Sequence, residues 1–349
     1  MAGTTTVVTL LLVPVLVFFL WHMTASSIPP VPSNLRNKRI ILLIAHPDDE
    51  SMFFSPTLQA LTHPSLQNHL KILCMSTGDS EGLGETRRKE IEAAAVTLGV
   101  RRREDVFVLN DDRFKDGMNE TWRPEEIVRV LASAFAPHLN ATLPANTTTT
   151  TTASSEPPSS DKEKEKDRRK SKSQKHSKSA SSSATPPPAA QNMPAGPRAT
   201  IDVLITFDAQ GISSHPNHIA LYHGAKQFIQ SIMKGHSGYA CPVALYTLPT
   251  VNMARKYSFI LDAVPTLLGG IYGSVFGGSK KQTIASSEAK QDTAAERTVF
   301  VNDIPRYWKA REAMVSGHKS QMVWFRWGWI SLGRYMVVND LRSERVVAS

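Results

Sequence analysis

Cysteine is scarce in this sequence: 349 residues contain two, Cys74 and Cys241. Two distant cysteines exclude a disulfide scaffold and a cysteine-rich metal module. Cys74 lies within an apolar run and is predicted to be a buried strand residue. This cysteine usage fits a reducing compartment best, so we expect both thiols to be unpaired.

Charged side chains are missing from the N-terminus, where Arg36 is the first Asp, Glu, Lys or Arg. Residues 7–21 are almost entirely apolar, which is slightly short of the roughly 20 residues that span a bilayer. A removed signal peptide is one interpretation, but no basic residue precedes the run. We therefore expect a retained membrane anchor over residues 1–23. The basic residues that follow it predict a body on the cytosolic side.

The sequence also lacks an even spread of its basic charge. Its net charge is +9, and residues 140–199 contribute 10 Lys and Arg against 5 Asp and Glu. The rest of the chain has an ordinary balance, which excludes a uniformly basic nucleic-acid binder, and we expect no nucleic-acid partner. Residues 140–199 contain no aromatic residue and almost no large apolar ones. We predict that this stretch is a disordered insert, because it cannot bury enough surface to offset its ordering entropy.

The remaining sequence alternates between short apolar runs and helical patterns. Residues 24–37 are predicted to be a proline-rich linker, and residues 38–139 and 200–340 to form one domain. The predicted strands cover 39–44, 70–75, 105–109, 201–207 and 243–248, and the predicted helices cover 51–62, 85–98, 124–136 and 216–232. This order predicts an α/β fold of Rossmann-like type, with a mostly parallel sheet and helices on both faces.

Two apolar stretches leave alternatives open. Residues 267–278 are rich in glycine and form either a flexible loop or a segment at a membrane interface. Residues 322–338 contain three tryptophans among arginines, which suits the lipid headgroup zone but also suits an aromatic helix in the core.

The strongest site signal is Ala45-His46-Pro47-Asp48-Asp49-Glu50, directly after the first predicted strand. Open α/β sheets place their ligands at this edge. His46 and Asp49 offer a nitrogen and an oxygen ligand to a divalent ion such as zinc, and Asp48 could act as a base on a water molecule there. A helix cap would explain one carboxylate of the motif but not all of them.

A second cluster, His215-Pro216-Asn217-His218, follows a later predicted strand in the same way. Together His46, Asp49 and His218 make three ligands and leave one position open, the number expected of a catalytic zinc. His215 is then free to polarise a carbonyl group or to stabilise an oxyanion.

Two weaker signals concern the substrate. Arg87 follows a glycine-rich turn at the start of a predicted helix and could bind a phosphate or a sugar hydroxyl, although a surface pair with Glu90 is the alternative. Asp112, past the third predicted strand, is a candidate for binding a sugar.

These motifs resemble those of the LmbE-like zinc-dependent N-deacetylases. The matching sequences are AHPDDE at residue 45, TGD at residue 77 with the following GxGExRxxE pattern, and HPNH at residue 215. The resemblance is closest to the branch that acts on N-acetylglucosaminyl-phosphatidylinositol in GPI-anchor synthesis, because of Val251-Asn252, Arg255-Lys256-Tyr257 and the run from His318 to Trp327.

The resemblance implies a metal-dependent hydrolase that removes the N-acetyl group of this glycolipid. It implies zinc held by His46, Asp49 and His218, Asp48 as general base, and His215 as electrophile or acid. Bacterial relatives often have Asp where this chain has Asn217, which leaves the orientation of His215 open. It further implies an endoplasmic reticulum membrane as the location. The alternatives are a deacetylase of a soluble N-acetylglucosamine conjugate and an inactive membrane adaptor.

Overall fold

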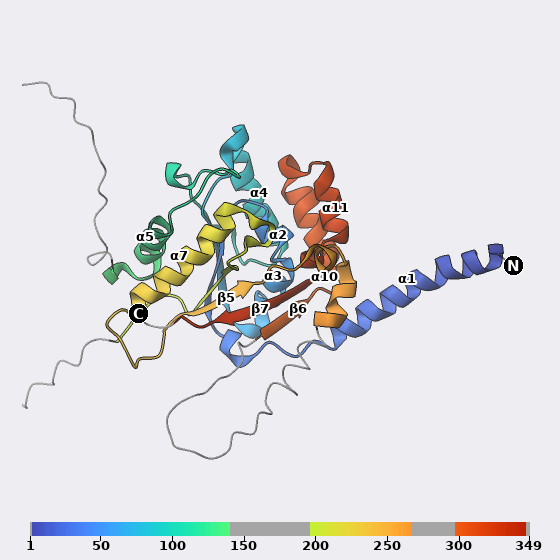
Figure 1. The fold of residues 1–349 in the computed structure, drawn as a ribbon, viewed down its shortest axis with the longest axis horizontal. Helices are drawn as coiled ribbons and strands as arrows, with labels where there is room; N and C mark the ends of the chain where they lie inside the picture. The colour runs from blue at the N-terminus through green and yellow to red at the C-terminus, as the bar shows by residue number, and fades with distance from the viewer. Residues whose placement is uncertain (1, 140–195, 267–296, 347–349) are drawn as a thin grey trace, which may run out of the picture. The chain divides into compact units, whose positions relative to one another are not determined.

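The computed structural model describes residues 2–139, 196–266 and 297–346, except for the side chains of residues 2–11 and 80 (Figure 1). The described residues all belong to one compact unit. Nearly all of the predicted insert, and the glycine-rich stretch at 267–278, lie outside the described residues, so both predictions stay untested.

The described residues build a seven-stranded sheet in the order β3-β2-β1-β4-β5-β7-β6. Its strands are β1 (Arg39–Ile44), β2 (His69–Cys74), β3 (Val106–Val108), β4 (Val203–Phe207), β5 (Ala244–Leu248), β6 (Arg297–Val301) and β7 (Val338–Glu344). The first five strands are parallel, while β7 runs antiparallel to both β5 and β6. The predicted mostly parallel α/β sheet is therefore confirmed.

The central strands form because their sequences are apolar on both faces. All residues of β1 except Arg39 are buried, and so is every residue of β4. Such continuous burial is typical of parallel strands that helices cover on both sides. Cys74 ends β2 as a buried free thiol, and Cys241 is free as well.

Helices cover the two faces as separate groups (Figure 1). Their bounds are α2 (Asp49–Met52), α3 (Ser55–Leu61), α4 (Gly84–Thr97), α5 (Pro124–Phe135), α6 (Gly211–Ser214), α7 (Pro216–Met233), α8 (Met253–Lys256), α10 (Ile304–Glu312) and α11 (Trp324–Leu332). Helix α5 packs on α7, whereas α10 packs on α3 and α4. The helix predicted over 51–62 is wrong as one element: it divides into α2 and α3 at Phe53 and Phe54, and Pro56 lies in the first turn of the second helix, which begins at Ser55.

Sequence periodicity did not predict the antiparallel pair β6 and β7. Strand β7 begins Val-Asn-Asp, yet Asn339 and Asp340 are fully buried. They are accommodated because they have partners: Asp340 accepts from Arg334 at 2.9 Å and from Arg297 at 2.5 Å. Strand β7 also extends beyond residue 340, where we expected the domain to end.

The N-terminal helix α1 (Ala2–Ser26) is attached to the body at its C-terminal end. The indole N–H of Trp21 donates to the carbonyl of Asn302 at 2.7 Å, and its ring meets those of Tyr307 and Phe259 edge-on. In the part of the chain that the structure describes, no helix has both the length and the hydropathy to cross a membrane. The anchor over residues 1–23 stays a prediction.

The core interpretation of the aromatic stretch 322–338 is confirmed in part, whereas its contact with a lipid headgroup zone stays a prediction. In α11, Trp329 and Ile330 are buried, whereas Trp324 is 85% exposed. The buried ring of Trp329 contacts Phe53, so one side of the helix belongs to the core and the other faces outward.

Candidate metal centre and active site

The two motif clusters meet because β1 and β4 are neighbours in the sheet. The chain leaves β1 toward β2 on one side and leaves β4 toward β5 on the other. Ligands of open α/β sheets bind where the strand order reverses in this way. The loop after Ile44 and the loop after Phe207 both begin at this point, as the sequence predicted.

The three predicted ligands lie together and are buried. Ligand atoms of His46, Asp49 and His218 all lie within 4.8 Å of one another. One carboxylate oxygen of Asp49 accepts from the backbone N–H groups of Ala45 and His46, and the other lies 3.3 Å from Nε2 of His218. Burial by itself raises the pKa of Asp49, but His218 and His46 outweigh it and hold this pKa well below its ordinary value.

Histidine 218 is prepared to act as a ligand. Its Nδ1 bonds the carbonyl oxygen of Gly211 at 3.1 Å, which fixes the N–H on that nitrogen. Its ring stacks on Phe207, with centroids 3.8 Å apart. Its Nε2 is buried and has no hydrogen-bond partner among the described residues. An orphaned buried nitrogen beside a carboxylate and a second imidazole fits a divalent metal ion.

Strained backbone precedes His215. Gly211 and Ile212 have φ of 61° and 59°, and a Cβ at Gly211 would lie 3.0 Å from Cβ of His218. The strained Ile212 is held by its carbonyl, which accepts from Nζ of the buried Lys256 at 2.9 Å. This contact gives Lys256, in the Arg-Lys-Tyr motif, a role in shaping the histidine loop.

Asp48 occupies a second strained position, with φ of 120° and a buried side chain. Burial raises the pKa of Asp48 above its ordinary value, and the carboxylates of Asp49 and Glu50 act in the same direction. Arg326 opposes this shift, since its Nη1 forms an ion pair with the Asp48 carboxylate. A carboxyl group with a raised pKa beside a candidate metal centre suits a base that takes up a proton and returns it.

A buried ion pair supports this strained turn from behind. Glu50 accepts from the backbone N–H of Asp48 at 3.1 Å and from the hydroxyl of Ser51. Its Oε1 lies 2.6 Å from Nε2 of His318, and both side chains are fully buried. The other ring nitrogen of His318 bonds Gln321. The pair thereby connects the Asp48 turn to the C-terminal segment.

His215 lies beside the ligands, with its ring centroid 4.9 Å from those of His46 and His218. Burial lowers the pKa of His215 to about 4, and the two neighbouring histidines contribute. Its Nδ1 accepts from the backbone N–H of Asn217 at 3.3 Å. A neutral ring with Nδ1 as acceptor carries its proton on Nε2, which is the form that donates a hydrogen bond.

Asn217 contacts His46 through its side chain instead of His215. Its Oδ1 lies 3.0 Å from Nε2 of His46, and its Nδ2 donates to the carbonyl of Glu120 at 2.8 Å. Asp116 also approaches Nε2 of His46, at 3.1 Å. His46, Asp116 and His215 form a second group that could hold a metal ion.

Arg87 lies at the edge of this site, where its guanidinium already has partners within the protein. It donates to the carbonyl of Gly78 at 2.6 Å and lies near Asp116 and Glu81. The surface pair with Glu90 is wrong as an alternative, because Glu90 instead accepts from Ser320. Binding of substrate by Arg87 stays a prediction.

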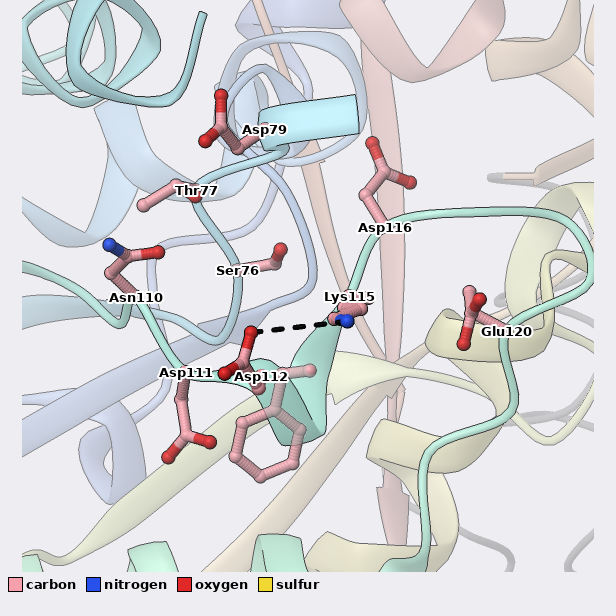
Figure 2. Close-up of a pocket in the computed structure, with 10 residues that line it drawn as sticks. Ser76, Thr77, Asp79, Asn110, Asp111, Asp112, Lys115, Asp116 and Glu120 are labelled. Atoms are coloured by element: carbon pink, nitrogen blue, oxygen red, sulfur yellow. Dashed lines mark ion pairs between the residues drawn. The ribbon is translucent and has the colours of Figure 1, made fainter. Parts of the chain in front are cut away.

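A polar pocket of about 260 Å³ adjoins the site (Figure 2). Its lining includes Ser76, Thr77, Asp79, Asn110, Asp111, Asp112, Lys115, Asp116 and Glu120. Asp116 connects the pocket to His46. Asp112 belongs to the lining, although its side chain is 99% exposed and pairs with Lys115 at 3.9 Å. The lining offers many hydroxyl-binding oxygens and one cation, which suits a neutral sugar better than a phosphate.

Comparison with known proteins identifies the family. Residues 41–229 match the family model described as PIG-L, GlcNAc-PI de-N-acetylase. A relative from Arthroderma benhamiae named N-acetylglucosaminyl-phosphatidylinositol de-N-acetylase is 40% identical, over 98% of each chain. The chain belongs to the GlcNAc-PI de-N-acetylase family. A Schizosaccharomyces pombe protein, named a probable enzyme of the same kind, is 30% identical over 91% of this chain and 92% of its own.

Several site residues of this family member were missed from the sequence. His318 and Arg326 belong to the C-terminal run that carried the resemblance, but nothing in their spacing showed that they reach Glu50 and Asp48. Asp116 had no signal at all, because it lies in an irregular loop. Only the fold brings these three residues to the site.

Proposed function

We propose that this chain hydrolyses the acetamide of N-acetylglucosaminyl-phosphatidylinositol, to give glucosaminyl-phosphatidylinositol and acetate in GPI-anchor synthesis. The 40% identity to a relative of that name, over 98% of both chains, supports the substrate. The observation that carries the reaction is the buried set of His46, Asp49 and His218 with the carboxyl group of Asp48 beside it.

His46, Asp49 and His218 would hold the metal ion, for which we propose zinc, although other divalent ions suit nitrogen and oxygen ligands. When bound, such an ion polarises a carbonyl oxygen and lowers the pKa of a water molecule. The remaining chemistry belongs to side chains of this protein.

Asp48 takes a proton from the water that attacks the acetamide carbon, and its ion pair with Arg326 favours the ionised form of the carboxylate that must accept this proton. The Nε2–H group of His215 donates to the acyl oxygen as this oxygen gains negative charge. A new C–O bond forms and the C–N bond breaks. Asp48 or His215 delivers the proton to the leaving amine, which leaves acetate and the free amino sugar.

The polar pocket beside Asp116 would bind the sugar ring, with Asp112 at its open side. Arg87 holds Asp116 and the Gly78 turn in place. We further propose an endoplasmic reticulum membrane as the location, with residues 1–23 as anchor and the site on the cytosolic face. The supporting observations are the uncharged N-terminus and the basic residues that follow it.

The test is release of labelled acetate from N-acetylglucosaminyl-phosphatidylinositol by the full-length chain. Asp48→Asn should lower the rate by about 100-fold or more, the usual effect of losing a general base. His218→Ala should abolish release. Asp202→Asn is the matched control, since that carboxylate pairs with Arg39 at the other end of the strands, and its rate should equal that of the wild type. Equal rates for Asp48→Asn and the control would disprove the mechanism.

A further inference from the structure

The outward side of α11 leaves three large aromatic side chains half or more exposed or nearly so, Trp324 most of all. Trp324, Phe325 and Trp327 are 85%, 53% and 46% exposed. Three such side chains within four residues are costly to leave in water, and a patch of this kind marks an interaction site. The helix itself is held firmly, because Trp329 is buried and its indole N–H donates to the carbonyl of Met52 at 3.2 Å.

The charged residues around this aromatic surface favour an anionic partner. Besides Arg326, which pairs with Asp48, residues 304–332 contain four Lys and Arg and a single acidic residue, Glu312. Arg311 lies over the ring of Trp308, which is itself 59% exposed, and donates to Ser331 on α11. Tryptophan beside basic side chains is the composition of proteins that lie in the headgroup layer of an anionic bilayer.

A second element, helix α1, also exposes apolar side chains. Helix α1 is fixed to α10 through Trp21 and Tyr307, and its side chains Phe18 and Phe19 are 58% and 60% exposed. Helices α1, α10 and α11 lie on the same side of the sheet (Figure 1). A lipid surface can cover apolar side chains on separate helices without a shaped groove, and it matches the basic residues beside them.

The same turn of α11 also reaches the active site. Arg326 lies between Phe325 and Trp327 in the sequence and forms the ion pair with Asp48. An α-helix is about 10–12 Å across with its side chains, so a lipid surface on the outward side of this turn lies roughly one helix diameter from the side that pairs with Asp48.

We propose that the Trp324, Phe325 and Trp327 surface of α11 docks onto an anionic lipid bilayer and holds the Asp48 site against it. This inference rests on the proposed function for the choice of a lipid-bound substrate. Docking through α11 places the headgroup sugar at the site while the acyl chains stay in the bilayer.

The test is fluorescence quenching of the full-length chain by vesicles of brominated phosphatidylcholine with phosphatidylinositol. The chain has six tryptophans, and of these Trp308, Trp324 and Trp327 are exposed. The double variant Trp324→Phe, Trp327→Phe keeps the aromatic surface but removes two of these three signals. The quenched intensity should therefore fall at least about twofold. Binding through α1 alone would leave the quenched intensity as in the wild type, and this result would overturn the proposal.

A second measurement separates docking from chemistry. Trp324→Ser with Trp327→Ser should slow acetate release from vesicle-borne substrate about tenfold while sparing a water-soluble analogue without acyl chains. Tyr239→Ser, which changes an aromatic residue 43% exposed elsewhere, is the matched control. An equal loss of rate on both substrates would overturn the proposal and show that the two tryptophans have a structural role. A change in the sedimentation of the chain without vesicles would overturn it too, and would show a contact between copies of the chain. If the wild type released no acetate but its quenching by vesicles still fell in the double variant, docking through α11 would stand and the proposed function would be refuted.

Discussion

Replacing His318 by alanine should destabilise this protein more than replacing any exposed histidine. Both partners of the His318–Glu50 pair are fully buried, with 2.6 Å between Nε2 and Oε1. Removal of His318 leaves the Glu50 carboxylate in the core with only the Ser51 hydroxyl and the Asp48 N–H group. Breaking a buried pair in this way costs roughly 3–5 kcal/mol. For a domain of this size that corresponds to a fall of about 6–20 °C in the thermal midpoint.

The assay is thermal unfolding of the full-length chain followed by circular dichroism. His69→Ala is the control, because His69 also pairs with a carboxylate, that of Asp105, but its side chain is 41% exposed. Solvent screens the exposed His69, and Lys71 and Arg102 still lie within 4 Å of the buried Asp105 carboxylate, so this variant should lose about 1 kcal/mol or less and unfold within a few degrees of the wild type. Equal midpoints for the two variants would refute the reasoning.

The pH dependence gives a second check on the same pair. Burial alone lowers the pKa of His318, but the ion pair and hydrogen bond with Glu50 outweigh it and raise this pKa above its ordinary value. A raised histidine pKa stabilises the folded state fully below the unfolded value of about 6.5, and this contribution is lost as the pH rises through the folded value. The difference between wild type and His318→Ala should therefore narrow toward alkaline pH.

Three further predictions concern packing, acid stability and topology. Gly224→Ala should lower the free energy of unfolding by about 1–3 kcal/mol, because the added Cβ would lie 2.5 Å from Cγ2 of Ile127. Adding Ile127→Ala should recover part of that loss, measured by denaturant unfolding. If the effects of the two substitutions simply add, the contact is contradicted. Hydrogen bonds from Arg39 lower the pKa of Asp202, so Asp202→Asn should cost at most about 1 kcal/mol near neutral pH. The difference in stability between the wild type and Asp202→Asn should vanish as the pH falls below about 3.9, because the carboxylate of Asp202 then becomes protonated. A difference that stays constant in acid would show that the Arg39–Asp202 ion pair is not its cause. Asn119 is exposed within an Asn-Glu-Thr sequon, so a cytosolic body predicts no change in gel mobility after glycosidase treatment, whereas a shift would show a lumenal body.

The sheet and the clustering of His46, Asp49 and His218 were predictable because their signals are local. Continuous apolar runs such as residues 39–44 have few alternatives to a buried strand, and His46 and Asp49 follow that strand directly. Parallel neighbours then bring His218 to the same edge. Strands β6 and β7 were missed since buried polar residues such as Asp340 break the apolar pattern, and only tertiary partners make their burial tolerable.

The residues behind the site could not be derived from spacing. Glu50 looked like one more carboxylate of its motif, and its partner is 268 positions away. Arg326 lies in an aromatic stretch of the sequence, whereas its guanidinium forms an ion pair with the Asp48 carboxylate. Contacts of this kind depend on how the C-terminal segment folds back over α2, and local sequence carries no information about that path.

The central claim is that acetate release depends on one divalent ion held by His46, Asp49 and His218. The most direct measurement starts from the full-length chain stripped of metal and adds zinc stepwise, with acetate release from N-acetylglucosaminyl-phosphatidylinositol followed at each step. Release should rise in proportion to zinc and level off at a single ion per chain, and Asp49→Ala should stay inactive throughout. Full release from the stripped chain, or from Asp49→Ala, would contradict the account.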